Sequence, residues 1–335
     1  MKKLALVTAL AAVAATTAHA DVTVYGKAAV GLDYTKVDTN PSEDSFDLSS
    51  NASRIGFKGS EELNPNLEAF YQAEAEVALD TGDTGDKNYF KARNTFVGLK
   101  HITLGSILVG FKDTLIKEAQ GKVDLFNDLN GGDLDMKKTL SGEERAKNTV
   151  EYALPTAELP VELKLSASLD NTEEEAEEHD DNAYFASLGY DFQGLGLTVA
   201  YGQDAQIKTA ATGDKGAADI VRVVGTYDLM GVQLGALYQN VTSDDIANFD
   251  DENSFLVSAS FKATSDLSLG AQFQQSTTSY TNGAADTDID QYGVIATYKV
   301  AKPLKMHGYL VNRNVDDGTD DFDTMVVGTA MEYKF

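Results

Sequence analysis

The sequence predicts an all-β protein, a 16-stranded antiparallel transmembrane β-barrel, and three observations lead to that prediction. Apolar and polar residues alternate along nearly the whole chain, as in Val161-Glu162-Leu163-Lys164-Leu165, which indicates strands with two different faces. The connections between these strands alternate regularly between long and short. The chain also begins with a segment typical of exported proteins.

The first 20 residues have the features of a secretory signal peptide. Lys2 and Lys3 precede an apolar run over residues 4–15, and Ala18-His19-Ala20 carries small residues where a signal peptidase reads them. The run is shorter than the roughly 20 apolar residues of a membrane-spanning helix, and no later run is long enough. We expect cleavage after Ala20, with residues 21–335 forming a single β-barrel domain; an N-terminal core helix is the alternative.

Sixteen segments then show the strand pattern, and the segment 102–111 alternates least well. The last one places Val327, Met331, Tyr333 and Phe335 on one face. The predicted strands cover residues 22–34, 50–60, 67–79, 90–99, 102–111, 145–154, 161–170, 183–192, 194–203, 218–228, 231–241, 253–262, 266–275, 290–299, 303–313 and 322–335.

The lengths of the connections predict a barrel with two unlike ends. Long acidic breaks and short breaks follow one another without exception, so antiparallel neighbours would gather all the long loops at one end, as outer-membrane barrels do. The long breaks are 35–49, 80–89, 112–144, 171–182, 204–217, 242–252, 276–289 and 314–321. The short breaks are 61–66, 100–101, 155–160, 193, 229–230, 263–265 and 300–302.

A soluble β-sandwich is the main alternative for alternating strands, and periodicity alone does not separate the two folds. The even strand count, the regular loop asymmetry and the export signal favour the barrel. The polar faces are also rich in Gly, Ser, Thr and Gln, which suits a crowded lumen. Aromatic residues at several strand ends fit the girdles at the two membrane interfaces, although strands are enriched in aromatics in any case.

The composition is strongly acidic and contains no cysteine. The chain has 27 Lys and Arg against 53 Asp and Glu, and loss of Lys2 and Lys3 with the signal changes the net charge from −26 to −28. This excess argues against nucleic acid as a partner, because phosphate contacts need Lys and Arg. The absence of cysteine means that the fold does not depend on disulfides.

Three loops contain runs of acidic residues, at 173–181, 244–252 and 316–323. They could bind divalent cations that bridge lipopolysaccharide phosphates, or focus cations at a channel mouth. A solvated surface explains them equally well and is the interpretation we favour. The sequence therefore predicts no definite metal site and no cofactor.

Several short motifs, in order along the chain, resemble the general (non-specific) Gram-negative outer-membrane porins of the trimeric 16-stranded type. Val22-Thr23-Val24-Tyr25-Gly26-Lys27 resembles their first strand, and residues 53–63 look like their second strand and first turn. Residues 92–100 are similar to their fourth strand, and residues 121–128 to their inward-folded third loop. Tyr333 and Phe335 resemble the signal that the barrel-assembly machinery reads, although Thr329 departs mildly from it.

This resemblance spans residues 21–335 and implies a function. It implies a homotrimer in the outer membrane, in contact with lipid and lipopolysaccharide, that forms a water-filled channel for passive diffusion of small hydrophilic solutes and ions. It implies no enzymatic reaction and no catalytic residue. The third loop, residues 112–144, would narrow the pore.

The resemblance also points to the residues of that narrowing, a basic wall opposed by an acidic loop. Alternation places the basic candidates on lumen faces, and an arginine facing lipid would cost about 2–4 kcal/mol at the membrane midplane. In the loop, Asp133 and Asp135 are weaker candidates than the two acids in the matching segment. The alternative is a set of scattered, solvated charges. The candidates are Lys27, Arg54, Arg93 and Arg145 on the wall, and Asp124 and Asp128 in the loop.

Three other functions fit the sequence less well. An outer-membrane enzyme would need a catalytic or metal spacing, and His101, His179 and His307 show neither. A structural or adhesin barrel acting through its acidic loops would have a lumen filled by bulky side chains, unlike these Gly-, Ser- and Ala-rich faces. A substrate-specific channel would show an aromatic ladder, and Phe70, Tyr71 and Phe185 are too scattered to form one.

Overall fold

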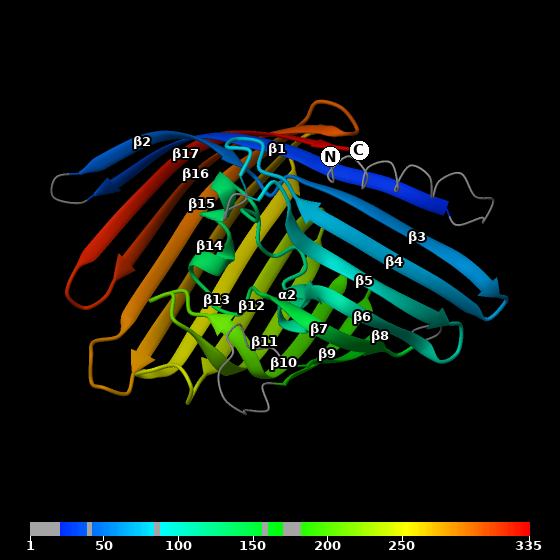
Figure 1. Cartoon of the computed structure of the whole chain (residues 1–335). Coiled ribbons are helices and arrows are strands. Elements are labelled where there is room, and N and C mark those ends of the chain that lie inside the picture. Colours follow the sequence, from blue (N-terminus) through cyan, green and yellow to red (C-terminus); the bar gives the residue numbers. More distant parts are fainter. Residues whose placement is uncertain (1–20, 39–41, 84–87, 156–159, 170–181) are drawn as a thin grey trace, which may run out of the picture.

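The computed structural model describes residues 21–38, 42–83, 88–155, 160–169 and 182–335, which form an antiparallel barrel (Figure 1). The signal segment expected over residues 1–20 lies outside the described residues. Each strand pairs with its neighbour along the chain, except that β2 and β3 both pair with β1, and β17 returns to pair with β1, which closes the barrel. The strands are β1 Asp21–Asp38, β2 Glu43–Ser50, β3 Arg54–Asn64, β4 Leu67–Glu76, β5 Lys91–His101, β6 Gly105–Asp113, β7 Arg145–Ala153, β8 Val161–Ser168, β9 Ala183–Phe192, β10 Leu195–Lys208, β11 Lys215–Leu229, β12 Val232–Thr242, β13 Phe249–Lys262, β14 Leu267–Tyr280, β15 Thr287–Lys299, β16 Leu304–Asp316 and β17 Asp321–Lys334.

The segments β2 and β3 are two halves of one barrel strand, so the barrel has the predicted 16 strands. Both pair with β1, β2 through Val30 opposite Ser50 and β3 through Lys27 opposite Arg54. Between the halves, the hydroxyl of Ser53 accepts from the Ala29 N–H at 2.9 Å and donates to the Ala29 carbonyl at 2.8 Å. This hydroxyl therefore satisfies the backbone N–H and carbonyl of Ala29 at the point where the backbone hydrogen bonds to the neighbouring strand are interrupted.

Several predicted long loops are shorter in the structure, because the strands continue beyond the predicted ends. The break at 35–49 is wrong: β1 runs to Asp38, β2 begins at Glu43, and Val37 pairs with Glu43. Acidic residues on both faces of a hairpin abolish the alternation without ending the strand. The turn placed at 100–101 lies instead at residues 102–104, and β6 starts at Gly105.

The barrel is apolar outside and polar inside. Leu197 and Val294 on the outer face are 42% and 53% exposed, whereas Arg222 and Gln274 on the inner face are fully buried. This inversion is what a lipid-facing barrel requires. No helix in the described residues is long and apolar enough to cross a membrane.

The third loop (L3, residues 114–144) folds into the barrel and explains the buried inner face. It contains the helix α2 Leu115–Ala119 and two short 3-10 turns, η1 Asn130–Gly132 and η2 Met136–Lys138. Figure 1 shows α2 and the rest of L3 inside the ring of strands. Buried side chains of L3 pack on the inner faces of β9 to β13, and Phe126 packs with residues of β16 and β17.

Candidate functional site

Three of the predicted basic residues lie close together on the inner face of the barrel. Lys27, Arg54 and Arg93 come from β1, β3 and β5, and Lys27 stands directly opposite Arg54 in the strand register. Like charges in directly opposed positions destabilise a sheet unless other charges compensate them. Strand alternation therefore brings these three basic residues together, and nearby carboxylates must compensate their repulsion.

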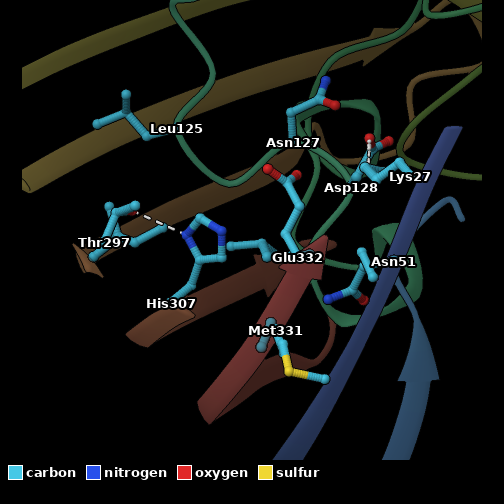
Figure 2. Close-up of a pocket in the computed structure, with 13 residues that line it drawn as sticks. Lys27, Asn51, Leu125, Asn127, Asp128, Thr297, His307, Met331 and Glu332 are labelled. Carbon is cyan, nitrogen blue, oxygen red and sulfur yellow. Dashed lines mark hydrogen bonds and ion pairs between the residues drawn. The ribbon is translucent and has the colours of Figure 1, made fainter. Parts of the chain in front are cut away.

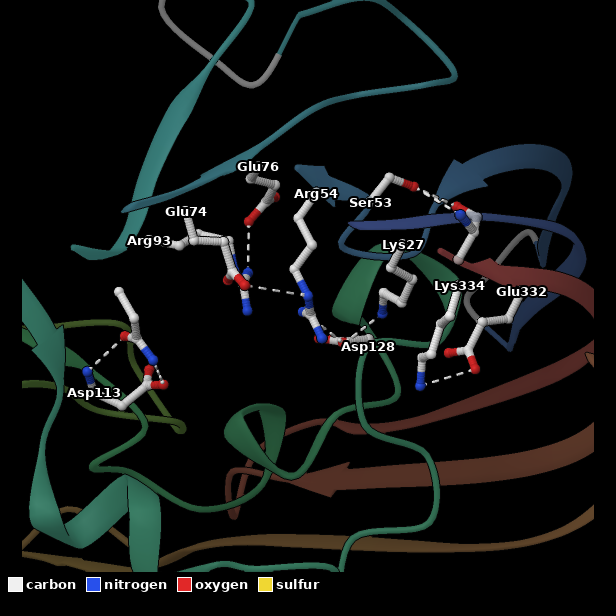
Figure 3. A network of polar contacts seen from close by, with 12 residues as sticks. Lys27, Ser53, Arg54, Glu74, Glu76, Arg93, Asp113, Asp128, Glu332 and Lys334 are labelled. Carbon is white, nitrogen blue, oxygen red and sulfur yellow. Dashed lines mark hydrogen bonds and ion pairs between the residues drawn. The ribbon is translucent and has the colours of Figure 1, made fainter. Parts of the chain in front are cut away.

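Two glutamates of β4, which sequence analysis did not single out, supply part of that compensation. The Arg93 guanidinium lies 2.8 Å from the Glu74 carboxylate and 2.9 Å from that of Glu76. Arg54 lies 3.8 Å from Glu74, which also accepts a hydrogen bond of 3.0 Å from the Tyr25 hydroxyl. Figure 3 shows these acids between the two arginines. In the sequence, Glu74 and Glu76 could have been identified as partners of the arginines, because they lie on the lumen face of a strand between two strands that carry basic residues.

Asp128 is the acidic residue of L3 that contacts the basic residues of the barrel wall. Its carboxylate lies 2.7 Å from the Lys27 ammonium and 3.6 Å from the Arg54 guanidinium (Figure 3). Burial alone would raise the pKa of Asp128, but the charges of Lys27 and the two arginines outweigh burial and hold that pKa below its ordinary value. Asp128 is therefore an ionised link between loop and wall.

Arg145, the fourth predicted basic residue, has a different partner. It begins β7, and its guanidinium lies 2.9 Å from the carboxylate of Asp113 at the end of β6. Asp113 also accepts a hydrogen bond of 2.8 Å from Asn94 on β5. Arg145 thus lies directly after the end of L3, on the same inner wall as Arg93.

Asp124 is not brought to the basic residues. It is buried inside L3, where it accepts hydrogen bonds from the backbone N–H groups of Phe126 and Met136 and from Gln272 of β14. Burial and the nearby charge of Asp135 raise its pKa. Its contacts organise the loop. The other two loop candidates have local partners: Asp133 pairs with Lys138, and Asp135 accepts from the backbone N–H of Lys137.

These residues form what we call the wall–loop cluster. It contains Lys27, Arg54, Arg93, Arg145, Glu74, Glu76, Asp113 and Asp128. Its four basic and four acidic groups balance. The alternation of sign continues next to it, where Lys112 lies 2.7 Å from Glu118 of L3 and 2.6 Å from Glu151 of β7. The arrangement is therefore interleaved rather than a purely basic wall opposite a purely acidic loop.

A pocket adjoins the cluster between L3 and the strands β1, β15, β16 and β17 (Figure 2). Lys27 and Asp128 line it together with His307 and Glu332. The His307 ring nitrogen Nδ1 lies 2.9 Å from the Thr297 hydroxyl. Among the described residues, no group of three His, Asp or Glu side chains is placed to hold a metal ion.

The two residues predicted as an assembly signal lie at the seam of the barrel. Tyr333 and Phe335 are exposed on the outer face, with ring centroids 6.3 Å apart. The backbone of Phe335 exchanges two hydrogen bonds with Gly26, of 3.0 and 3.1 Å. A Cβ on Gly26 would lie 2.4 Å from the Phe335 ring, so glycine is required for this close approach.

Comparison with known proteins gives one consistent result. Residues 6–318 match the family model described as Gram-negative porin. The chain is 27% identical to the outer membrane porin PhoE of Enterobacter cloacae over the full length of both chains. Its fold is similar to that of the anion-selective porin from Comamonas acidovorans, with a TM-score of 0.75 at 18% identity, covering 95% of this chain and 100% of that one. It is also similar to a trimer form of OmpT from Vibrio cholerae, with a TM-score of 0.68 at 18% identity, covering 94% and 99%.

The family match covers most of the chain, and the barrel with its inward-folded loop agrees with it. The chain therefore belongs to the Gram-negative porins and is an outer-membrane channel for the diffusion of small solutes.

Proposed function

We propose that the wall–loop cluster is the constriction of this channel and sets both its width and its charge preference. One observation carries the proposal: Asp128, a residue of L3, lies 2.7 Å from Lys27 and 3.6 Å from Arg54 on the wall. L3 thus crosses the lumen at the height of the basic residues. A solute that passes there must move along the charged side of the remaining opening.

Closely spaced opposite charges act on whatever passes between them. They orient water and polar solutes, and an apolar solute must displace that ordered water, so it is disfavoured. Because the cluster balances four positive with four negative groups, its net preference between cations and anions is small. This supports a general channel rather than one dedicated to a single charged substrate.

The acidic outer loops then tilt the balance. At physiological salt the Debye length is about 8 Å, so loop charges act mainly at the channel mouth, where they enrich cations. We propose modest cation selectivity, restrained by Arg54 and Arg93. The Comamonas porin, which shares the fold, is described as anion-selective, so the barrel fold alone does not imply a preference for cations.

The active form proposed here is a homotrimer that lacks residues 1–20 and carries out no covalent reaction. The outer face of early strands carries small residues that let neighbouring barrels approach closely, namely Ala28, Val30, Ala69, Ala73 and Ala75. The trimer form of a related fold supports this assembly. Lipopolysaccharide and lipid around the barrel, and the barrel-assembly machinery through Tyr333 and Phe335, are the further proposed partners.

Single-channel recording in planar bilayers with asymmetric salt tests the proposal. We expect conductance steps in groups of three and a small zero-current potential of the sign that indicates cation preference. A strong anion preference in the unmodified channel would contradict the proposed balance of charges.

A further inference from the structure

Arg222 is the largest fully buried side chain of the described residues, and it lies outside the wall–loop cluster. It projects from β11 toward L3. Its Nε donates to the Gln239 side chain at 2.8 Å, and its Nη1 donates to the Ile116 carbonyl at 3.0 Å and to the Glu143 carboxylate. Its Nη2 lies 3.3 Å from the Ser141 carbonyl. One guanidinium therefore contacts both limbs of L3, near the start and near the end of the loop.

Because the Arg222 guanidinium is buried, its charge and its N–H donors must all have partners. Removing one partner of a buried ion pair is strongly destabilising because it leaves an uncompensated charge, and here Glu143 is as enclosed as Arg222. The planar guanidinium presents five donors in a fixed fork, whereas a lysine offers one ammonium point charge. Only arginine can reach both limbs of the loop and the neighbouring strand at once.

Neighbouring contacts reinforce the same point of attachment. Glu252 of β13, also fully buried, accepts from the Ser141 N–H at 3.0 Å and from its hydroxyl at 2.5 Å. Gln239 donates to the Ser141 carbonyl at 2.9 Å. On the apolar side, Ile116 packs in a buried cluster that includes Ile220, two residues before Arg222. The neck of L3, by which we mean its first residues 115–119 and its last residues 141–144, is thus bound to β11, β12 and β13 by polar and apolar contacts together.

The same neck carries charged side chains that contact the barrel wall and one another. Glu118 of α2 pairs with Lys112 at 2.7 Å, and Lys117 donates to the Glu143 carbonyl at 2.7 Å. Arg145 follows Glu143 by two residues. A shift of the neck away from the wall would therefore move charged groups at the opening, even though Arg222 itself never meets a passing solute.

We propose that Arg222 is a positioning residue that ties both limbs of L3 to the barrel wall and thereby fixes the width of the passage. This rests on the proposed role of the wall–loop cluster as the constriction. The tip of L3 has its own attachments, including the Gly131 N–H donating to Asn51 at 3.0 Å. Loss of the Arg222 contacts therefore loosens the neck of L3, while the tip around Gly131 keeps its contacts with the wall.

The test uses the full-length channel and removes both charges of the buried Arg222–Glu143 pair at once, in R222Q/E143Q. We expect a folded barrel, shown by its heat-modifiable electrophoretic mobility, with a noisier open state and faster entry of larger sugars into proteoliposomes. The matched control is R313Q, because Arg313 is another lumen arginine that donates a single hydrogen bond, of 3.0 Å, to L3 at the Asp133 carbonyl. The control should change sugar entry much less.

A thiol reporter measures the loop directly, since the native chain contains no cysteine. Ile116 is fully buried, so I116C alone should react slowly with a hydrophilic maleimide. Adding R222Q/E143Q should speed labelling roughly tenfold, which corresponds to about 1.4 kcal/mol less cost of local opening. If R222Q/E143Q does not fold, R222K with I116C provides the second test, with a smaller rise in labelling and noise.

Folded R222Q/E143Q or R222K channels with unchanged noise, sugar entry and labelling would overturn the positioning role. That failure differs from failure of the proposed constriction, which would appear as unchanged ion selectivity after substitution of Arg54 and Arg93.

Discussion

The Lys27 ammonium and the Asp128 carboxylate lie 2.7 Å apart although 101 residues separate them in the chain. The contact joins β1, at the seam where the barrel closes, to the tip of L3. Removing Asp128 leaves Lys27 opposite the like charge of Arg54, and removing Lys27 leaves Asp128 with Arg54, 3.6 Å away, as its remaining basic partner. The contact therefore couples the position of the loop to the charge of the opening.

Two aspartates of L3 should respond differently to neutralisation. D128N removes a charge from the wall–loop cluster, so cation preference should fall two- to fivefold, the range expected when about 1 kcal/mol of interaction at ~4 Å in a water-like medium is lost. D124N replaces a buried acceptor of three hydrogen bonds, so it should lower the thermal midpoint with little effect on selectivity. Zero-current potentials and thermal denaturation of both variants separate the two roles. Equal selectivity shifts would contradict this division.

Glu74 should control the two arginines beside it. It contacts both Arg93 and Arg54 and accepts from Tyr25. E74Q leaves the guanidinium charges less compensated, so anion permeability should rise by a factor of about two to five. Glu62 is exposed on the neighbouring strand near the turn, and E62Q serves as the control with the same change of charge. An equal effect of the two substitutions would show that position in the cluster is unimportant.

Glu144, at the end of L3, should make stability depend on pH. Burial and the neighbouring Glu143 charge raise its pKa to about 7, so the folded state binds a proton that the unfolded state releases near pH 4.5. The contribution of this group therefore weakens as pH rises from about 4.5 to about 7, by at most about 1.4 kcal/mol per pH unit. Thermal midpoints measured from pH 5 to pH 8 should fall less steeply in E144Q than in the native protein. Identical slopes would contradict the raised pKa.

The proposed trimer predicts that bulk is tolerated on one side of the barrel only. A73L adds volume to the small outer surface of β4, whereas A271L adds it to the outer face of β14. Leucine is compatible with lipid at both places, so only contact between barrels distinguishes them. Unboiled electrophoresis and crosslinking should show less trimer for A73L and native levels for A271L. A native protein that is monomeric in membranes would refute the trimer and leave the barrel intact.

The sequence predicted the strands better than the site, for a physical reason. Alternation is local, so the strand count and the inward direction of Lys27, Arg54 and Arg93 could be derived from short windows of sequence. The hairpin over residues 35–49 was missed because acidic residues interrupt the alternation on both of its faces, with Asp44 beside Phe46 on one face and Asp47 on the other. Glu74 and Glu76 have the same alternation as other lumen residues, and their importance depends on β3 and β5 lying on either side.

The loop was the least predictable part. L3 has no regular period, so nothing in the sequence distinguishes Asp124, which is buried in the loop, from Asp128, which reaches the wall. Arg222 shows the same limit. Alternation places its side chain inside the barrel. Its burial depends on contact with L3, for example with the carbonyl of Ile116, which lies 106 residues earlier in the chain.

The central claim, that a charge in the wall–loop cluster affects ion preference more than a charge in the outer loops, is tested most directly by zero-current potentials in a salt gradient. R54Q/R93Q removes two charges from the cluster, and D317N/D320N removes two from an exposed outer loop. We expect a clearly stronger cation preference for R54Q/R93Q, by about two- to fivefold per charge, and a smaller, opposite shift for D317N/D320N because mouth charges are screened. A larger shift for the loop variant would contradict the claim and assign selectivity to the outer loops.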